Sequence, residues 1–341
     1  MTKKFIPGII LATILVLIFL IWAMIGPGTA FSGKTAVLQI PTKNSHRSTV
    51  EEQLNKQDIL AFPFAFNFVA GRLDYWTNIK PGQYLIKKGM SSIDIVRMLR
   101  NGKQSPVNLV INKFRTREEL SGFMGRKLEC DSSDIIRFLN DPDSVRLFGL
   151  DTNNILTAII PNTYTMYWNT TASKLLRRLY SEREIFWNKE RLAKLHRLNL
   201  TKEQVYILAS IIEEETNKLD EKPLIASVYI NRMRKNMRLA ADPTIKFALR
   251  NFGLKRITLK YIDACEESPY NTYKKYGLPP GPISTPSEKS IDGVLNVANT
   301  DYLFFCAKPD FSGYHSFASN EKDHFRNARE YQRALDSLMI K

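Results

Sequence analysis

Hydrophobic residues fill the N-terminus without interruption. Residues 5–25 are apolar, and no charged residue occurs from Phe5 to Gly33. About 20 apolar residues cross a bilayer as a helix, whereas the apolar core of a signal peptide has about 7–15, so residues 5–25 predict a transmembrane anchor. Lys3 and Lys4 precede this run and predict that residues 1–4 form a cytoplasmic tail, with the rest of the chain outside.

After a linker at residues 26–34, short apolar runs alternate with amphipathic segments up to residue 150. Period-2 or continuous apolar runs predict strands at 35–40, 80–86 and 107–112. Apolar residues at helical spacing predict helices at 48–60, capped by Ser48 or Thr49, and at 89–103 and 116–128. Residues 35–150 are therefore expected to form a small α+β lobe.

From residue 151 to 341 the pattern becomes mainly helical. The segments with helical periodicity are 171–198, 201–219, 223–237 and 324–339. Residues 301–317 predict a hairpin with its turn at 309–313. A long stretch at 267–290 is rich in Pro, Gly and Tyr, and such loops in compact domains are commonly functional. We expect a mainly helical second domain with one β-hairpin, and an α+β fold class for the whole chain.

The net charge and the placement of basic residues bear on which classes of partner the chain could bind. The 341 residues carry 49 Lys and Arg against 34 Asp and Glu, a net charge of +15. The basic residues are scattered, and no basic groove with interleaved aromatics points to nucleic acid. For a chain outside a membrane, the charge suggests anionic lipid headgroups or an anionic wall polymer, but the stronger interpretation is that many of these basic residues lie on solvated helix faces.

Three consecutive glutamates, Glu213, Glu214 and Glu215, lie within the predicted helix at 201–219. At 100° per residue they point in three directions, so they cannot form a convergent acid pair. Periodicity puts Glu215 nearest the apolar face, Glu214 toward the surface, and Glu213 on a stripe of small and polar residues that includes Ser210. A carboxyl with apolar neighbours has a raised pKa and serves as a general acid for glycosidic bond cleavage. Glycosidases commonly add a second carboxylate, for which Asp242 and Asp263 are candidates.

Other chemistries have weak support. The sequence has no HExxH, GxSxG or Walker pattern, and its three cysteines and four histidines lack ligand spacing. We expect no metal and no cofactor. Ser319 to Lys322 match S-x-x-K without a following KTG, a pattern that short sequences often match by chance.

Four segments together resemble the YceG-like family of endolytic murein transglycosylases: "LASIIEEET", "ASVYINRMRKNMRLAADPTIKFAL", "YNTYKKYGLPPGPISTPS" and "YHSFASNEKDH". The resemblance covers essentially the whole chain and includes a LysM-like module at 80–103. It implies a lytic transglycosylase anchored in the bacterial cytoplasmic membrane by one helix, with residues 151–341 as its extracytoplasmic catalytic domain. Such an enzyme cuts within peptidoglycan strands, between N-acetylmuramic acid and N-acetylglucosamine, and leaves a 1,6-anhydromuramic acid end.

The resemblance also implies roles for individual residues. The catalytic acid is the first glutamate of the motif, Glu213, which would act as general acid and then as base, with Glu215 as a supporting residue. The family usually has a Gln in the segment before "DPT", where this chain has Ala240 and Ala241. Asn162 occupies the position of an Asp in the family pattern. The expected substrate-binding or supporting residues are Ser210, Glu215, Asp242, Thr244, Tyr270, Asn271 and Tyr273.

Peptidoglycan strands are the expected partner, and the resemblance adds penicillin-binding proteins and the elongation machinery. The sequence leaves two alternatives to a transglycosylase open. One is a lysozyme-type hydrolase that uses Glu213 and Asp242. The other is a non-catalytic peptidoglycan-binding scaffold.

Overall fold

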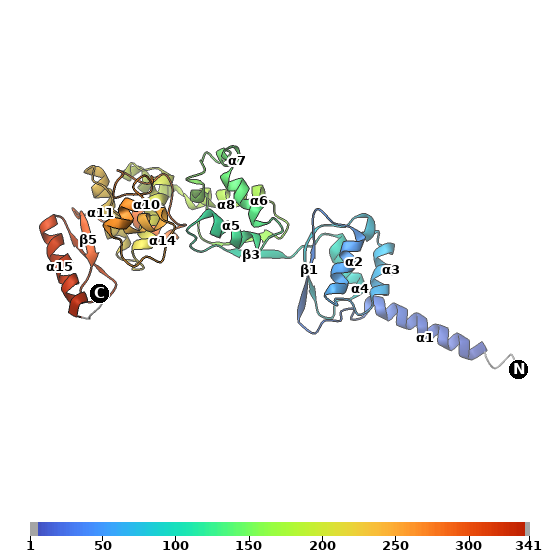
Figure 1. The fold of residues 1–341 in the computed structure, drawn as a ribbon. Coiled ribbons are helices and arrows are strands. Elements are labelled where there is room, and N and C mark those ends of the chain that lie inside the picture. Colours follow the sequence, from blue (N-terminus) through green and yellow to red (C-terminus); the bar gives the residue numbers. More distant parts are fainter. Residues whose placement is uncertain (1–5, 338–341) are drawn as a thin grey trace. The chain divides into compact units, whose positions relative to one another are not determined.

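The computed structural model describes residues 6–337 (Figure 1). Within this range the fold is mixed and mostly helical, with three two-stranded sheets, β1-β2, β3-β4 and β5-β6. The elements are, in order, α1 Ile6–Ile25, β1 Thr35–Ile40, α2 Arg47–Lys56, α3 Pro63–Arg72, η1 Tyr75–Thr77, β2 Gly82–Lys87, α4 Ser92–Arg100, β3 Pro106–Val110, α5 Arg117–Gly125, α6 Ser132–Asn140, α7 Pro142–Arg146, η2 Ile155–Ala158, β4 Thr163–Tyr167, α8 Ala172–Phe186, α9 Lys189–Leu198, α10 Lys202–Glu215, α11 Lys222–Arg234, α12 Asp242–Ala248, α13 Leu259–Ala264, α14 Glu288–Leu295, β5 Phe304–Ala307, β6 His315–Ala318 and α15 Glu321–Ser337.

The chain divides into two compact units. The first holds the residues up to Leu109 together with Lys127–Cys130 and Thr165–Thr171, and the second holds the remainder. This division does not coincide with the expected boundary between residues 150 and 151, because most of residues 110–150 cluster with the second unit. One reason is a reciprocal pair of bonds within that unit: the Phe114 amide donates to Thr285 Oγ1 (2.9 Å), and the Thr285 amide donates to the Phe114 carbonyl (2.8 Å).

The helix α1 is apolar throughout. Its segment Gly8–Ile25 has a mean hydropathy of 2.9 and is long enough to cross a bilayer, which fits the predicted anchor. The residues on which the predicted orientation rests, Lys3 and Lys4, lie outside the described part of the chain. Residues 26–34, expected as a linker, are bonded into the first unit: Gly28 donates to the Met90 carbonyl (3.0 Å) and Ala30 to that of Ile59 (3.0 Å).

The first unit is built around the antiparallel pair β1 and β2, in which Leu38 faces Tyr84. Helices α2, α3 and α4 complete the core. The strand predicted at 35–40 is confirmed as β1, and the helix predicted at 89–103 is confirmed as the shorter α4, which Ser91 caps. The cap predicted for α2 is wrong, because His46, not Ser48 or Thr49, is the N-cap residue. The sequence did not predict α3, because its run of apolar residues lacks an obvious polar face.

The helix α10 is the centre of the second unit. Eight consecutive residues, Val205–Ile212, are buried among α11, α12, α14 and η2. A reciprocal capping box of Thr201 and Gln204 starts the helix, and Thr216 in extended conformation ends it. The three glutamates therefore occupy the last turn, where the helix dipole disfavours negative charge, so nearby cations are needed to stabilise them.

The other predictions for the second unit hold in outline. The hairpin is confirmed as β5 and β6, and a closing helix follows as α15. The single helix expected at 171–198 is wrong: α8 ends at Phe186, and Asn188 caps the separate helix α9. Residues 266–287 contain no helix or strand and pack along α10, where the Ile283 amide donates to Ser210 Oγ (3.1 Å).

Candidate active site

Glu213 is held by three side chains of neighbouring elements. Its Oε2 accepts hydrogen bonds from Ser287 Oγ (2.7 Å) and Ser290 Oγ, and lies 3.4 Å from Lys222 Nζ. Burial raises the pKa of this carboxyl, but the two serine hydroxyls and the Lys222 charge outweigh burial and keep the pKa below its ordinary value. The raised pKa expected of a carboxyl with apolar neighbours therefore does not describe Glu213, whose surroundings favour the ionised form.

The contacts of Glu213 connect the end of α10 to the start of α14. Ser287 is the N-cap of α14, so the carboxylate sits at the positive end of that helix. Lys222 is itself buried and donates to the Thr216 carbonyl (3.2 Å) and to Ser290 Oγ (2.7 Å). Glu213 and Lys222 thus fasten the end of α10 to the start of α14.

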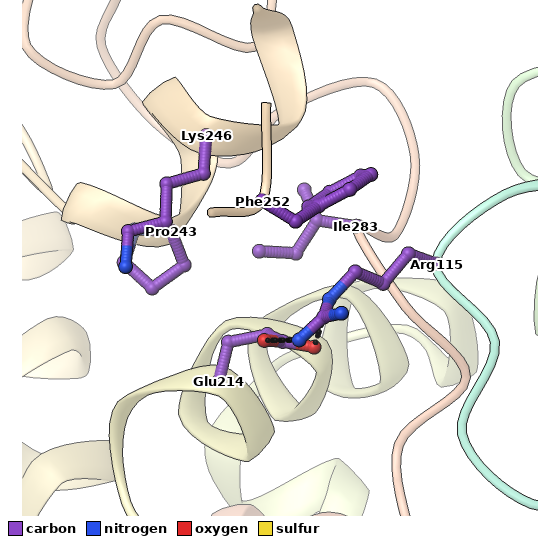
Figure 2. A pocket seen from close by; sticks show the side chains of 6 residues that line it. All are labelled: Arg115, Glu214, Pro243, Lys246, Phe252 and Ile283. Atoms are coloured by element: carbon purple, nitrogen blue, oxygen red, sulfur yellow. Dashed lines mark hydrogen bonds and ion pairs between the residues drawn. The ribbon is translucent and has the colours of Figure 1, made fainter. Parts of the chain in front are cut away.

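Glu214 is not the surface residue that periodicity suggested. Only 14% of its side chain is exposed, and Arg115 binds it in a bidentate manner, with Nε at 3.1 Å and Nη2 at 2.9 Å. Lys113 approaches the same carboxylate to 3.3 Å. Figure 2 shows this pair on one side of a small cavity, with α12 and Phe252 opposite. The cavity is lined by Arg115, Glu214, Pro243, Lys246, Phe252 and Ile283.

Glu215 has the least compensated carboxyl of the three. Its Oε1 accepts one hydrogen bond, from the Tyr229 hydroxyl of α11 (2.6 Å), and the residue is only partly exposed. Burial raises its pKa to about 7; the Tyr229 bond lowers it, the negative charge of Asp242 raises it, and Lys246 and Arg232 lower it. A carboxyl with this pKa can hold a proton near neutral pH and can also release it.

Asp242 lies at the start of α12 and forms a second acid–tyrosine pair. The Tyr273 hydroxyl donates to its Oδ1 at 2.5 Å. Because the charge of Asp242 raises the pKa of Glu215, and the charge of Glu215 raises the pKa of Tyr273, the structure brings these three predicted residues into one region. The other carboxylate considered, Asp263, is instead paired with Lys274 (2.9 Å).

Three predicted residues have buried, internally bonded side chains. Ser210 Oγ donates to the Ile207 carbonyl, and Thr244 Oγ1 to the Ala241 carbonyl. Asn271 Nδ2 donates to the carbonyls of Ile262 and Cys265. All three are fully buried, so their observed contacts order α10, α12 and the loop beside them.

Tyr270 packs against α12. Its ring packs 4.7 Å from that of Phe247 and lines a second cavity, which shares Arg115 with the first. The lining residues of this cavity are Arg115, Thr116, Arg117, Thr152, Asn153, Leu156, Phe247, Arg250, Tyr270 and Pro282. Its character is basic and aromatic.

The S-x-x-K match and metal binding, both considered from the sequence, gain no support from the described residues. Ser319 donates to the Asp301 carboxylate (2.6 Å), so its hydroxyl is engaged away from Lys322. Across residues 6–337, no group of three or more His, Cys, Asp or Glu side chains is arranged to hold a metal ion.

Comparison with known families decides where the chain belongs. The YceG-like family model matches residues 38–330, well over half of the chain. The chain belongs to the YceG-like family.

Several relatives of this YceG-like chain have descriptive names. It is 26% identical over 338 residues to an endolytic murein transglycosylase of Streptococcus pneumoniae R6, a match that covers 89% of this chain and 60% of the relative. A protein of Bacillus subtilis 168 with the same name is 26% identical, with 91% of this chain and 88% of the relative covered. The chain spans about 60% of the length of the pneumococcal relatives it matches.

A solved structure gives the same family. The crystal structure of a yceG-like protein from Listeria monocytogenes aligns with a TM-score of 0.57 and 26% identity. The alignment covers 86% of this chain and 98% of that protein.

Two residues at the site of this YceG-like chain were missed by sequence reasoning. Tyr229 bonds Glu215, and Arg232 acts electrostatically on it, one turn further along α11. Arg232 is fixed by the carbonyls of Leu303 and Leu239, both at 2.7 Å. The i, i+3 spacing of these two residues puts them on one face of α11, but nothing in the sequence says that this face meets the end of α10.

Proposed function

We propose that this chain is a peptidoglycan lytic transglycosylase in which Glu215 is the general acid and then the base. The observation that carries the proposal is the contrast within α10. The pKa of Glu215 is raised to about 7, whereas that of Glu213 is lowered by Lys222 and two serines. The names of the relatives, endolytic murein transglycosylase, supply the reaction class.

The reaction needs one carboxyl that changes its protonation state. Protonated Glu215 gives its proton to the glycosidic oxygen that leaves the anomeric carbon of N-acetylmuramic acid. The resulting carboxylate then takes the proton of the muramic acid 6-hydroxyl while that oxygen bonds the anomeric carbon. The products are an N-acetylglucosamine end and a 1,6-anhydromuramic acid end, and Glu215 is protonated again.

The neighbours of Glu215 suit both halves of this cycle. Burial and the Asp242 charge favour the protonated form that starts the reaction. The Tyr229 hydroxyl donates to the carboxylate form that exists between the two steps, and the positive charges of Lys246 and Arg232 stabilise that form electrostatically. We therefore assign Tyr229 and Asp242 as positioning and pKa-setting residues.

This proposal departs from the family resemblance, which implies that Glu213 is the acid. A general acid must carry a proton at the working pH, and the three donors around Glu213 favour its ionised form. All of these contacts are to Oε2, and protonation of the carboxyl would weaken them, so the contacts suit a brace better than a proton donor.

The remaining parts of the proposal concern location and partners. We propose that α1 anchors the chain in the cytoplasmic membrane with its N-terminus inside, as the preceding Lys3 and Lys4 suggest. The first unit would serve as a LysM-like glycan-binding module. Newly made strands near penicillin-binding proteins and the elongation machinery would be the substrate, an idea that rests on the family resemblance.

One observation favours a second candidate, a hydrolase. Asp242 lies within electrostatic range of Glu215, so the two could act as an acid and a second carboxylate. In that case water, not the 6-hydroxyl, would attack the anomeric carbon. The 2.5 Å bond from Tyr273 engages one oxygen of Asp242, which favours a fixed charge over a free base.

Product analysis separates these functions. The full-length chain in detergent is incubated with purified peptidoglycan, and the soluble fragments are identified by mass spectrometry. Anhydro ends, which lack one water relative to reducing ends, support the transglycosylase, and reducing ends support the hydrolase. Binding without fragments would leave only a scaffold.

A further inference from the structure

The helix α3 carries an exposed apolar face that its unit does not use. Ala65, Phe66, Val69 and Ala70 point into the core, whereas Phe64 and Phe68 remain 48% and 53% exposed. These exposed fractions are similar to those of the apolar side chains on α1, such as Ile18 at 57%. A helix on the surface of a soluble unit ordinarily has a polar outer face, so this face needs an occupant.

The position of the face relative to α1 identifies that occupant. The Phe19 ring of α1 lies 5.8 Å from Phe62 and 6.5 Å from Phe64, and Trp22 lies 5.4 Å from Phe62. Phe19 is inside the apolar span Gly8–Ile25, and 25 − 19 = 6 residues separate it from the end of that span. At about 1.5 Å per residue, Phe19 and its partners lie about 9 Å below the end of the apolar segment.

The link between α1 and the first unit is short and fixed by hydrogen bonds. The Ser92 hydroxyl of α4 donates to the Ala23 carbonyl of α1 (3.3 Å), and the Gly28 amide donates to the Met90 carbonyl. Ala23 is completely buried in this contact. Figure 1 shows α1 leaving the unit beside α3 and α4. A membrane that holds α1 therefore reaches α3 as well.

We propose that the Phe64 and Phe68 face of α3 is inserted in the outer leaflet of the bilayer, beside α1. The inference rests on the proposed anchor and goes beyond it, since the first unit would be seated in the lipid and not held above it. The charge pattern agrees: α3 contains no acidic residue, and its final residue, Arg72, places its guanidinium 5.5 Å over the Phe68 ring. An arginine at this border can reach lipid headgroups while its stem stays against apolar atoms.

Depth-dependent quenching tests the proposal on the full-length chain in lipid nanodiscs. Cys130, Cys265 and Cys306 are replaced by Ser, and one cysteine is then introduced by Phe68→Cys and labelled with bimane. Matched labels come from Ile18→Cys inside the proposed span and from Lys103→Cys, which follows the end of α4 remote from Ala23. Nanodiscs with and without bromine on the upper acyl chain provide the lipid quencher, and iodide provides the aqueous one.

We expect the label at position 68 to lose intensity in brominated lipid, as at position 18, and to resist iodide. The label at position 103 should respond to iodide alone. Phe64→Cys repeats the measurement at a second exposed position of the same face.

Three results would overturn the proposal. If iodide but not bromine quenches position 68 while position 18 is quenched by bromine, the anchor stands and the seated helix does not. If neither 18 nor 68 is quenched by bromine, the anchor falls too. If position 68 resists both quenchers, a second copy of the chain covers the face.

Discussion

The hydrogen bond from Tyr229 to Glu215 makes a prediction for the pH dependence of cleavage. The proposed acid is active when protonated, so kcat/KM should fall as pH rises through about 7, the pKa of Glu215. In Tyr229→Phe the donor that favours the carboxylate is removed, so the pKa of Glu215 should rise and the alkaline limb should move to higher pH.

The contact gives the size of this shift. At 2.6 Å it is a short bond to a charged group, and such bonds contribute about 1.5 kcal/mol or more. Since about 1.4 kcal/mol corresponds to one pKa unit, the limb should move up by about one pH unit. At pH 8 the unsubstituted chain would retain about a tenth of its plateau rate and Tyr229→Phe about half of its own.

Two further variants make the assay decisive. Asp242→Asn removes the negative charge that raises the pKa of Glu215, so its limb should move the opposite way, to lower pH. Tyr206→Phe is the matched control, because it also removes a buried hydroxyl next to α10, one that donates to the Ile159 carbonyl instead (2.5 Å). If Tyr229→Phe leaves the limb in place, or moves it down, Glu215 is not the group that titrates.

Three stability predictions follow from other contacts, each measured by urea unfolding of the full-length chain in detergent. Glu213→Gln leaves Lys222 buried without its counter-ion and should lower the free energy of unfolding by about 3 kcal/mol. The double variant with Lys222→Met should recover part of this loss. An equal loss in the single and the double variant would contradict the ion-pair explanation. Thr201→Ala breaks the capping box of α10 and should cost about 1 kcal/mol, whereas no change would mean that the cap is not formed in solution. Gly281→Ala would place a Cβ 2.0 Å from the Asn153 carbonyl oxygen and should cost about 1–3 kcal/mol, and an unchanged stability would show that the loop is free to move there.

Local patterns in the sequence were sufficient for much of the fold. The strand at 35–40 and the helix at 89–103 followed from alternation and from helical spacing of apolar residues, both of which are patterns within a few positions. The helix α3 was missed because an apolar run carries little periodic contrast. Its outer residue Phe64 lies beside Phe19 of α1, a contact between segments about 40 residues apart in the sequence.

Contacts between residues far apart in the sequence are also what local patterns failed to predict at the candidate site. Helical geometry correctly separated the three glutamates into different directions. It could not say what each would meet, because Ser287 lies 74 positions from Glu213 and Arg115 lies 99 from Glu214. Burial and neighbours far apart in the sequence, not the helix period, lower the pKa of Glu213 and raise that of Glu215.

Glu215→Gln is the most direct test of the central claim. The amide keeps the shape of the side chain but cannot donate a proton as a carboxylic acid does. Because the folded chain raises the pKa of Glu215, ionisation costs stability as pH rises from about 4.5 to about 7, so above pH 7 the variant should be at least as stable as the unsubstituted chain.

The measurement is mass spectrometry of peptidoglycan digests, made with Glu215→Gln beside the double variant of Glu213→Gln and Lys222→Met. The account predicts no anhydro-ended fragments from Glu215→Gln and continued cleavage by the folded double variant. Anhydro-ended fragments from Glu215→Gln would contradict it.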